Sequence, residues 1–175
     1  LSEWSFSKGF EFTFPKGFEI PPGGYAVICR DAHAFNSHYG GEPRLAGVFK
    51  GKLSHNGERI ELADARGQRI DGVKFSDQAP WPLGADGYGA SLERICPNAV
   101  GEDATNWASS EVKSRDHAAG TPGRQNSSFS QVPLPLISEV RFDKAEPNHS
   151  VTVTATVADP SGVQSVTLAW KAVSV

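Results

Sequence analysis

Glycine and proline divide this chain into short segments, and that spacing limits its fold more than any other feature. The 175 residues include 18 Gly and 12 Pro. Glycine permits positive φ angles in tight turns, whereas proline interrupts helices and central strands. Between these breakers apolar residues alternate with polar ones, as in Phe10, Phe12 and Phe14. Because period-two alternation predicts strands with one apolar face, we expect an all-β fold.

The clearest local prediction is a β-hairpin that follows the tight-turn pair Asn56-Gly57. Residues 58–62 alternate, residues 64–67 form a turn, and the returning segment carries Ile70, Val73 and Phe75. Two alternating runs joined by a short glycine-containing turn are typical of a hairpin.

Two further elements are expected before this hairpin. The continuous apolar run 25–29 predicts a central strand buried on both faces. Residues 31–40 predict a helix of one or two turns, with Asp31 as its N-cap.

A polar run that ends at Pro133 and Pro135 predicts an interdomain linker. We therefore divide the chain into a first domain of residues 1–128, a linker of 129–135, and a partial second β unit of 136–175. Alternation predicts three strands in that second unit, over residues 138–142, 151–157 and 166–170. Since three strands leave an apolar face without a partner sheet, we expect this unit to dock on the first domain, complete its edge, or pair with a second chain.

Charge and hydropathy exclude two classes of partner. The net charge of −3 argues against generic nucleic-acid binding, which needs a concentrated basic face. No run of 18 apolar residues occurs, so no membrane span is expected. The chain starts at Leu1 without a charged and apolar leader, and we expect it to be a piece of a longer protein with any export signal upstream.

The two cysteines, Cys29 and Cys96, leave two alternatives open. They form a disulfide if the segments that carry them are neighbours, or they are two buried thiols.

The sequence contains no catalytic motif of the HExxH, GxSxG or P-loop kind, so neither an enzyme nor a cofactor is expected. Four aspartates near turns are weighed as calcium ligands, namely Asp71, Asp77, Asp86 and Asp103. Calcium needs about six to eight converging oxygens, and Asx-turns explain the same residues more simply.

Trp81, Tyr88 and Trp107 form a possible contact surface, because aromatic side chains on loops are typical of sugar-stacking and protein-contact sites. The alternative, which we favour, is that they pack beneath the long loop of residues 77–89 and cover the end of the fold.

A series of landmarks occurs in order over the first 128 residues. They are Leu1-Ser2-Glu3-Trp4, Phe14-Pro15-Lys16-Gly17, Ile20-Pro21-Pro22-Gly23-Gly24-Tyr25, Leu53-Ser54-His55-Asn56-Gly57-Glu58, Ile60-Glu61-Leu62, Gly67-Gln68-Arg69-Ile70-Asp71, Trp81-Pro82, Gly89-Ala90-Ser91-Leu92-Glu93-Arg94, Asn106-Trp107 and Gly120-Thr121-Pro122-Gly123-Arg124-Gln125-Asn126. With these landmarks the segment resembles the lamin tail domain of the bacterial secreted kind.

The resemblance implies an immunoglobulin-like β-sandwich that serves as an accessory module in a secreted or cell-surface multidomain protein. The expected role is non-catalytic binding or tethering of a protein, cell-surface or polysaccharide partner. A carbohydrate-binding module and a structural spacer for an enzyme domain elsewhere in the parent chain are the alternatives. The family usually has one or two strands before the Leu-Ser-x-Trp segment, and they are missing here. A sheet edge is therefore expected to be open, which would allow strand-mediated self-association, or to be filled by another segment. Residues 136–175 resemble the start of a fibronectin- or cadherin-like sandwich by pattern alone.

Overall fold

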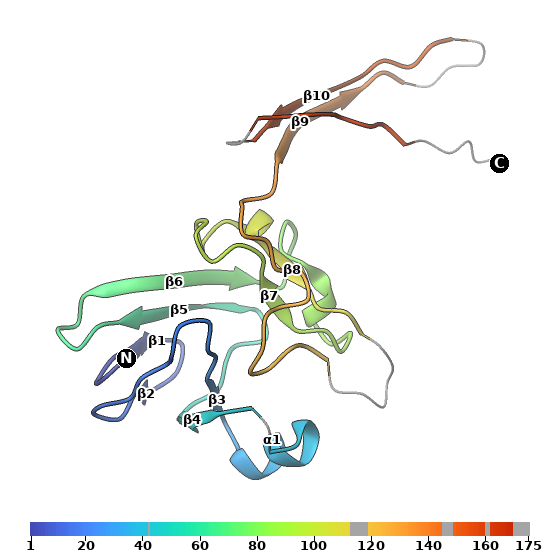
Figure 1. The fold of residues 1–175 in the computed structure, drawn as a ribbon. Helices are drawn as coiled ribbons and strands as arrows, with labels where there is room; N and C mark the ends of the chain where they lie inside the picture. The colour runs from blue at the N-terminus through green and yellow to red at the C-terminus, as the bar shows by residue number, and fades with distance from the viewer. Residues whose placement is uncertain (42, 113–118, 145–148, 160–161, 170–175) are drawn as a thin grey trace. The chain divides into compact units, whose positions relative to one another are not determined.

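The computed structural model describes residues 1–41, 43–112, 119–144, 149–159 and 162–169. It divides into two compact units, Leu1–Val132 and Pro133–Val175 (Figure 1). The boundary lies inside the predicted linker 129–135. The start of that linker belongs to the first unit, because the backbone N–H of Ser130 donates to the carbonyl of Ile95 at 3.0 Å.

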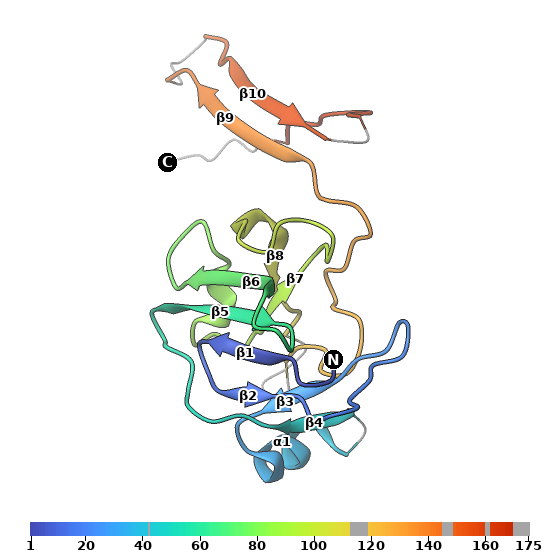
Figure 2. The ribbon, with the colours of Figure 1, turned by 90° about the vertical axis from the view of Figure 1, so that its left-hand side faces the viewer.

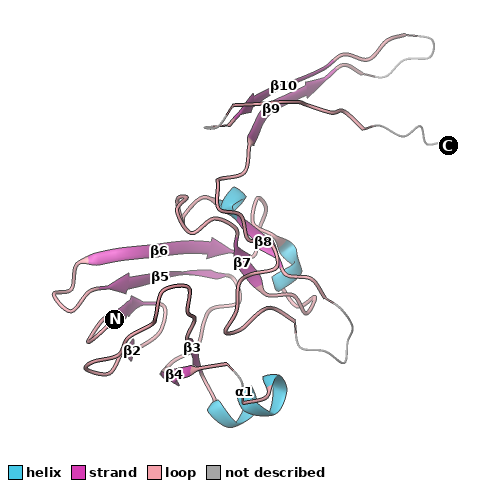
Figure 3. Cartoon of the chain, viewed as in Figure 1, coloured by secondary structure: helices cyan, strands magenta, loops and turns pink. Residues whose placement is uncertain are grey.

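Strands make up most of the regular structure, which agrees with an all-β class (Figure 3). The first unit contains β1 (Ser5–Lys8), β2 (Phe12–Thr13), β3 (Val27–Cys29), α1 (Ala32–Tyr39), β4 (Leu45–Val48), β5 (Gly57–Ala63), β6 (Arg69–Ser76), the 3-10 helix η1 (Leu83–Ala85), β7 (Leu92–Arg94), the 3-10 helix η2 (Ala104–Asn106) and β8 (Trp107–Ser109). Among the described residues, α1 is the only α-helix.

The largest sheet is antiparallel and has the order β2-β1-β5-β6 (Figure 2). Its β5–β6 pair confirms the predicted hairpin, with Ile60 opposite Val73 in the register. The connecting turn closes where the N–H of Gly67 donates to the carbonyl of Asp64 at 2.9 Å. Gly67 has a φ of 80°, which glycine adopts without a steric penalty.

Strands β3 and β4 pair in parallel, with α1 as the connection between them. The helix prediction is confirmed, since the Asp31 side chain accepts from the N–H of Ala34 at 2.9 Å.

The prediction of a central strand over 25–29 is wrong. Strand β3 has 3 residues and pairs with β4 alone among the described strands, and Tyr25 is 43% exposed. A parallel pair needs a crossover connection, and the segment with α1 provides it.

A cluster of phenylalanine rings forms the core between the large sheet and the β3–β4 pair. Phe6 and Phe10 lie 4.6 Å apart between ring centroids, and Phe10 lies 4.5 Å from Phe49, which follows β4. Phe14 is buried at 7% exposure and contacts Phe12 edge to face at 5.0 Å. Phe10, which lies on the apolar face predicted by alternation, therefore packs against Phe49 far along the chain.

The second unit contains β9 (Leu136–Phe142) and β10 (Val153–Ala158), paired antiparallel. These two strands confirm two of the three predicted ones. The third, over 166–170, is not formed where the structure describes it, since residues 162–169 carry no strand and Trp170 lies outside the described residues. Alternation supplies an apolar face, but a strand also needs a neighbouring backbone for its hydrogen bonds.

No helix in the described part of the chain has the length and apolar character needed to cross a membrane.

Candidate functional site

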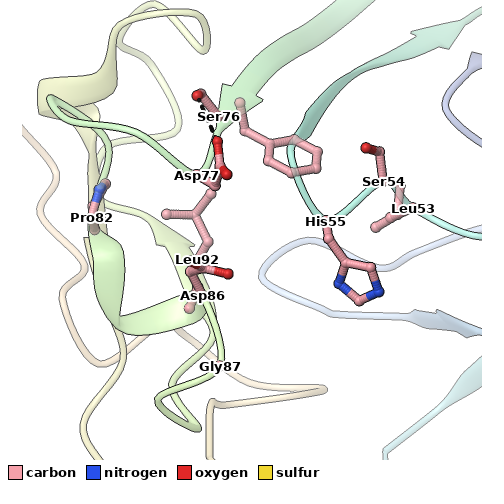
Figure 4. A pocket seen from close by; sticks show the side chains of 11 residues that line it. Leu53, Ser54, His55, Ser76, Asp77, Pro82, Asp86, Gly87 and Leu92 are labelled. Atoms are coloured by element: carbon pink, nitrogen blue, oxygen red, sulfur yellow. Dashed lines mark hydrogen bonds between the residues drawn. The ribbon is translucent and has the colours of Figure 1, made fainter.

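A pocket of about 290 Å³ opens in the first unit between the loop before β5, the end of β6, and the segment around η1 (Figure 4). Its apolar walls come from Leu53, Phe75, Pro82 and Leu92. Residues of the loop before β5 on one side, and residues from the end of β6 to the start of β7 on the other, thus form one concave surface.

The polar lining of this pocket consists of Ser54, His55, Ser76, Asp77 and Asp86. Figure 4 shows His55 on one wall, with Asp77 and Asp86 on the opposite wall. The hydroxyl of Ser76 donates to Asp77 at 3.4 Å. No hydrogen bond or ion pair joins the carboxylate of Asp86 to another residue that the structure describes.

Close packing fixes the backbone beside this pocket. An ideal Cβ on Gly84 would lie 2.8 Å from the Cβ of Ser109 and would also clash with its hydroxyl, so glycine is required at this turn of η1. Behind the pocket wall, Trp81 is 9% exposed and its ring centroid lies 6.0 Å from that of Trp107. The indole N–H of Trp107 donates to the carbonyl of Gly101 at 2.8 Å.

The three aromatic residues predicted as a contact surface therefore separate into two groups. Trp81 and Trp107 pack together beneath the loop, which is the alternative that the sequence favoured. Tyr88 is 77% exposed and follows Gly87, one of the residues that line the pocket. Tyr88 is therefore the one of the three with a largely exposed side chain.

Glu93 is the principal buried anchor of the loops in this region, with 3% exposure. Its carboxylate accepts from the Thr121 hydroxyl at 2.9 Å, and from the N–H and hydroxyl of Ser127 at 2.9 and 2.7 Å. The side-chain amide of Asn126 donates to the carbonyl of Arg94 at 2.9 Å. This segment, which lies near the end of the predicted first domain, is thereby fastened to β7.

Asn106 plays a similar part on the next loop. Its amide oxygen accepts from the N–H of Cys96 at 2.8 Å, and its amide nitrogen donates to the Cys96 carbonyl at 2.9 Å. A side chain thus takes the place of a strand neighbour, and two buried backbone groups are satisfied.

A charged cluster ties the loop that contains Glu102 to the large sheet. Glu102 accepts from Arg69 at 2.7 Å and from Arg59 at 2.9 Å, and Arg59 also donates to Glu61 at 2.9 Å. The hydrogen bond from Arg69, together with the charge of Arg59, lowers the pKa of Glu102 below its usual value. Arg94 forms a further ion pair with Asp71 nearby.

The aspartates weighed as calcium ligands serve separate roles. Asp71 pairs with Arg94, and Asp103 caps η2 by accepting from the N–H of Thr105 at 2.9 Å. Asp77 and Asp86 line the pocket. Over the described residues, no group of three or more His, Cys, Asp or Glu side chains gathers to hold a metal ion.

Of the two alternatives for the cysteines, the disulfide is not formed. Cys29 and Cys96 are both buried and free. Cys29 ends β3, which pairs with β4, whereas Cys96 follows β7, which pairs with β8. The thiol of Cys96 donates instead to the carbonyl of Gln131 at 3.6 Å.

Sequence reasoning missed the pocket, and it also missed the buried carboxylate of Glu93. Leu53, Ser54 and His55 appeared only as part of a turn landmark, and Glu93 only as part of a strand. The surplus of hydroxyl and amide side chains at residues 121–127 was the available signal for a buried acceptor.

Searches against protein-family models, curated proteins and solved structures find no match to this chain.

Proposed function

We propose that the first unit is a non-catalytic binding or tethering module of the lamin-tail-like kind, with an immunoglobulin-like sandwich as its framework. It serves a secreted or cell-surface multidomain protein. The order of sequence landmarks supports the family and the location, and the several antiparallel strand pairs agree with the framework.

The observation that carries the proposal is an exposed aromatic residue beside a preformed pocket. Tyr88 is 77% exposed, and the neighbouring pocket has a volume of about 290 Å³. Exposed aromatic side chains are enriched where proteins contact their partners. Glu93 and Asn106 fasten the segments around Ser127 and Cys96 through hydrogen bonds, which stabilises the unit that carries the pocket.

The side chains that line the pocket also favour a binding role over a catalytic one. Nucleophilic catalysis requires a nucleophile within hydrogen-bond reach of a base that a third group orients. Within the described part of the chain, no hydrogen bond joins His55 to Ser54, Asp77 or Asp86. The carboxylate and hydroxyl groups of the pocket are instead arranged as acceptors and donors for a ligand.

A carbohydrate-binding module is the second candidate, because Tyr88 offers one exposed ring for stacking. A broad stacking platform would also need the faces of Trp81 and Trp107, which pack against each other. A structural spacer would use neither Tyr88 nor the pocket.

Titration of the purified chain tests these candidates, with tryptophan fluorescence as the signal because Trp81 directly precedes the pocket residue Pro82. Protein or peptide ligands are expected to shift the emission, and Tyr88→Ala is expected to abolish the shift. Tyr25→Ala, which removes another exposed tyrosine, is the matched control. A shift caused by glycans alone would favour the carbohydrate-binding module.

Esters, phosphodiesters and glycosides are assayed in parallel. Turnover that survives repurification would overturn the non-catalytic proposal, and no response to any ligand would favour the spacer.

A further inference from the structure

The charge of the pocket is one-sided. Its lining includes the carboxylates of Asp77 and Asp86 and no lysine or arginine. A concave site lined by one sign of charge attracts the opposite sign, and low-dielectric walls strengthen that attraction.

The walls suit an aliphatic stem that ends in a cation. Leu53, Phe75 and Leu92 supply apolar surface, while Asp77 and Asp86 lie on the same wall (Figure 4). Lysine and arginine side chains bury their methylene groups against apolar surface and keep their charged ends at polar groups. A volume of about 290 Å³ lies at the lower limit of the range for drug-sized ligands, about 300–1,000 Å³, so the pocket suits a single side chain.

The neighbouring sheet edge favours a peptide as the carrier of that side chain. Strand β6 is the outermost strand of the four-stranded sheet, and its last residues, Phe75 and Ser76, line the pocket. An outermost strand presents backbone N–H and C=O groups that an extended peptide can pair with. A free amine or an amino sugar would fill the pocket without using this edge.

We propose that the pocket takes the lysine or arginine side chain of an extended segment from a partner protein, with the cation at Asp77 and Asp86. This inference rests on the binding role proposed above and specifies its ligand.

The test uses the full chain and a labelled peptide of alternating Ser and Thr with one central Lys. Companion peptides carry Arg, Gln or acetyl-lysine at the centre. Fluorescence anisotropy is expected to show that the Lys and Arg peptides bind at least about tenfold more tightly than the Gln and acetyl-lysine peptides. Because solvent-accessible ion pairs contribute up to about 1 kcal/mol, Asp77→Asn and Asp86→Asn should each weaken binding by up to about fivefold.

Glu19→Gln is the matched control, since it removes a carboxylate that lines a different pocket, beside Arg44. It should leave the affinity unchanged, and circular dichroism should show the same fold for all three variants. Raising the salt concentration should weaken binding of the Lys peptide to the parent chain and have less effect on the Asp variants.

Equal binding of the Lys and Gln peptides would overturn the inference and leave the general binding role standing. Binding of chitosan oligomers with the same dependence on Asp77 and Asp86, but none of the Lys peptide, would overturn the peptide as carrier. If neither peptides nor glycans bind, the inference and the proposed function both fail.

Discussion

Two phenylalanines show how differently the two units bury apolar surface. Phe14 in the first unit is 7% exposed and lies in a cluster of aromatic rings. Phe142 in the second unit is 75% exposed, although it lies on a regular strand paired with β10. Both residues belong to alternating segments that predict an apolar strand face. Alternation therefore predicts that a face exists, but burial depends on whether another layer covers it.

The second unit leaves most of its large apolar side chains exposed. They are Leu134, Leu136, Ile137, Val140, Phe142, Val151, Val153, Val163, Val166 and Leu168, each exposed by 40% or more. A hairpin without a covering layer is at best marginally stable in water. The first unit, in contrast, joins its strand pairs through shared aromatic contacts and buried polar anchors.

Separating the two units should give the largest effect. A peptide of residues 133–175 should lack stable strand structure, whereas residues 1–132 should unfold cooperatively. Circular dichroism during thermal unfolding measures both. A cooperative transition of the 133–175 peptide alone would contradict the comparison.

Substituting the two phenylalanines tests the comparison residue by residue. Phe14→Ala should lower the free energy of unfolding by about 3–5 kcal/mol, because it leaves a cavity in the core. Phe142→Ala, its control, should change that quantity by less than about 0.5 kcal/mol. Urea unfolding of the full chain provides the values, and similar losses for both variants would show that a covering layer lies over Phe142.

Two glutamates provide a polar version of the same test. Glu93→Ala should cost about 1–3 kcal/mol of stability, because it removes the buried carboxylate that accepts hydrogen bonds from the part-buried Thr121 and Ser127. Glu139 is exposed and accepts one hydrogen bond, from the Thr156 hydroxyl at 3.0 Å. Glu139→Ala should therefore cost less than about 1 kcal/mol, and urea unfolding distinguishes the two outcomes.

The smallest expected effect is a pH dependence from Glu102. Its pKa is lowered in the folded state, chiefly by the hydrogen bond from Arg69, so its ionised form stabilises the fold. That contribution is present above the usual value of 4.5 and is lost as the pH falls through the lowered pKa. Stability measured between pH 6 and pH 3 should fall less in Glu102→Gln than in the parent chain. An identical slope in both proteins would exclude this role, and Glu19→Gln is the control.

The sequence by itself determined the elements that close within a few residues. The β5–β6 hairpin follows from alternation and a turn at Asp64, and α1 follows from the Asp31 cap. Such elements are predictable because their hydrogen bonds join neighbours in the chain. The run 25–29 and the segment 166–169 were misjudged because their structure depends on which other segments lie beside them.

Tertiary structure alone decided the candidate site. The pocket joins Leu53, Phe75 and Leu92 from three separate segments, and Glu93 meets Ser127 across 34 positions of the chain. Tertiary structure also buried Trp81, packed Trp107 against it and left Tyr88 exposed, although all three look alike as loop aromatics in the sequence. The physical reason is that burial and pocket shape arise from contacts between distant segments, and local residue patterns do not specify those contacts.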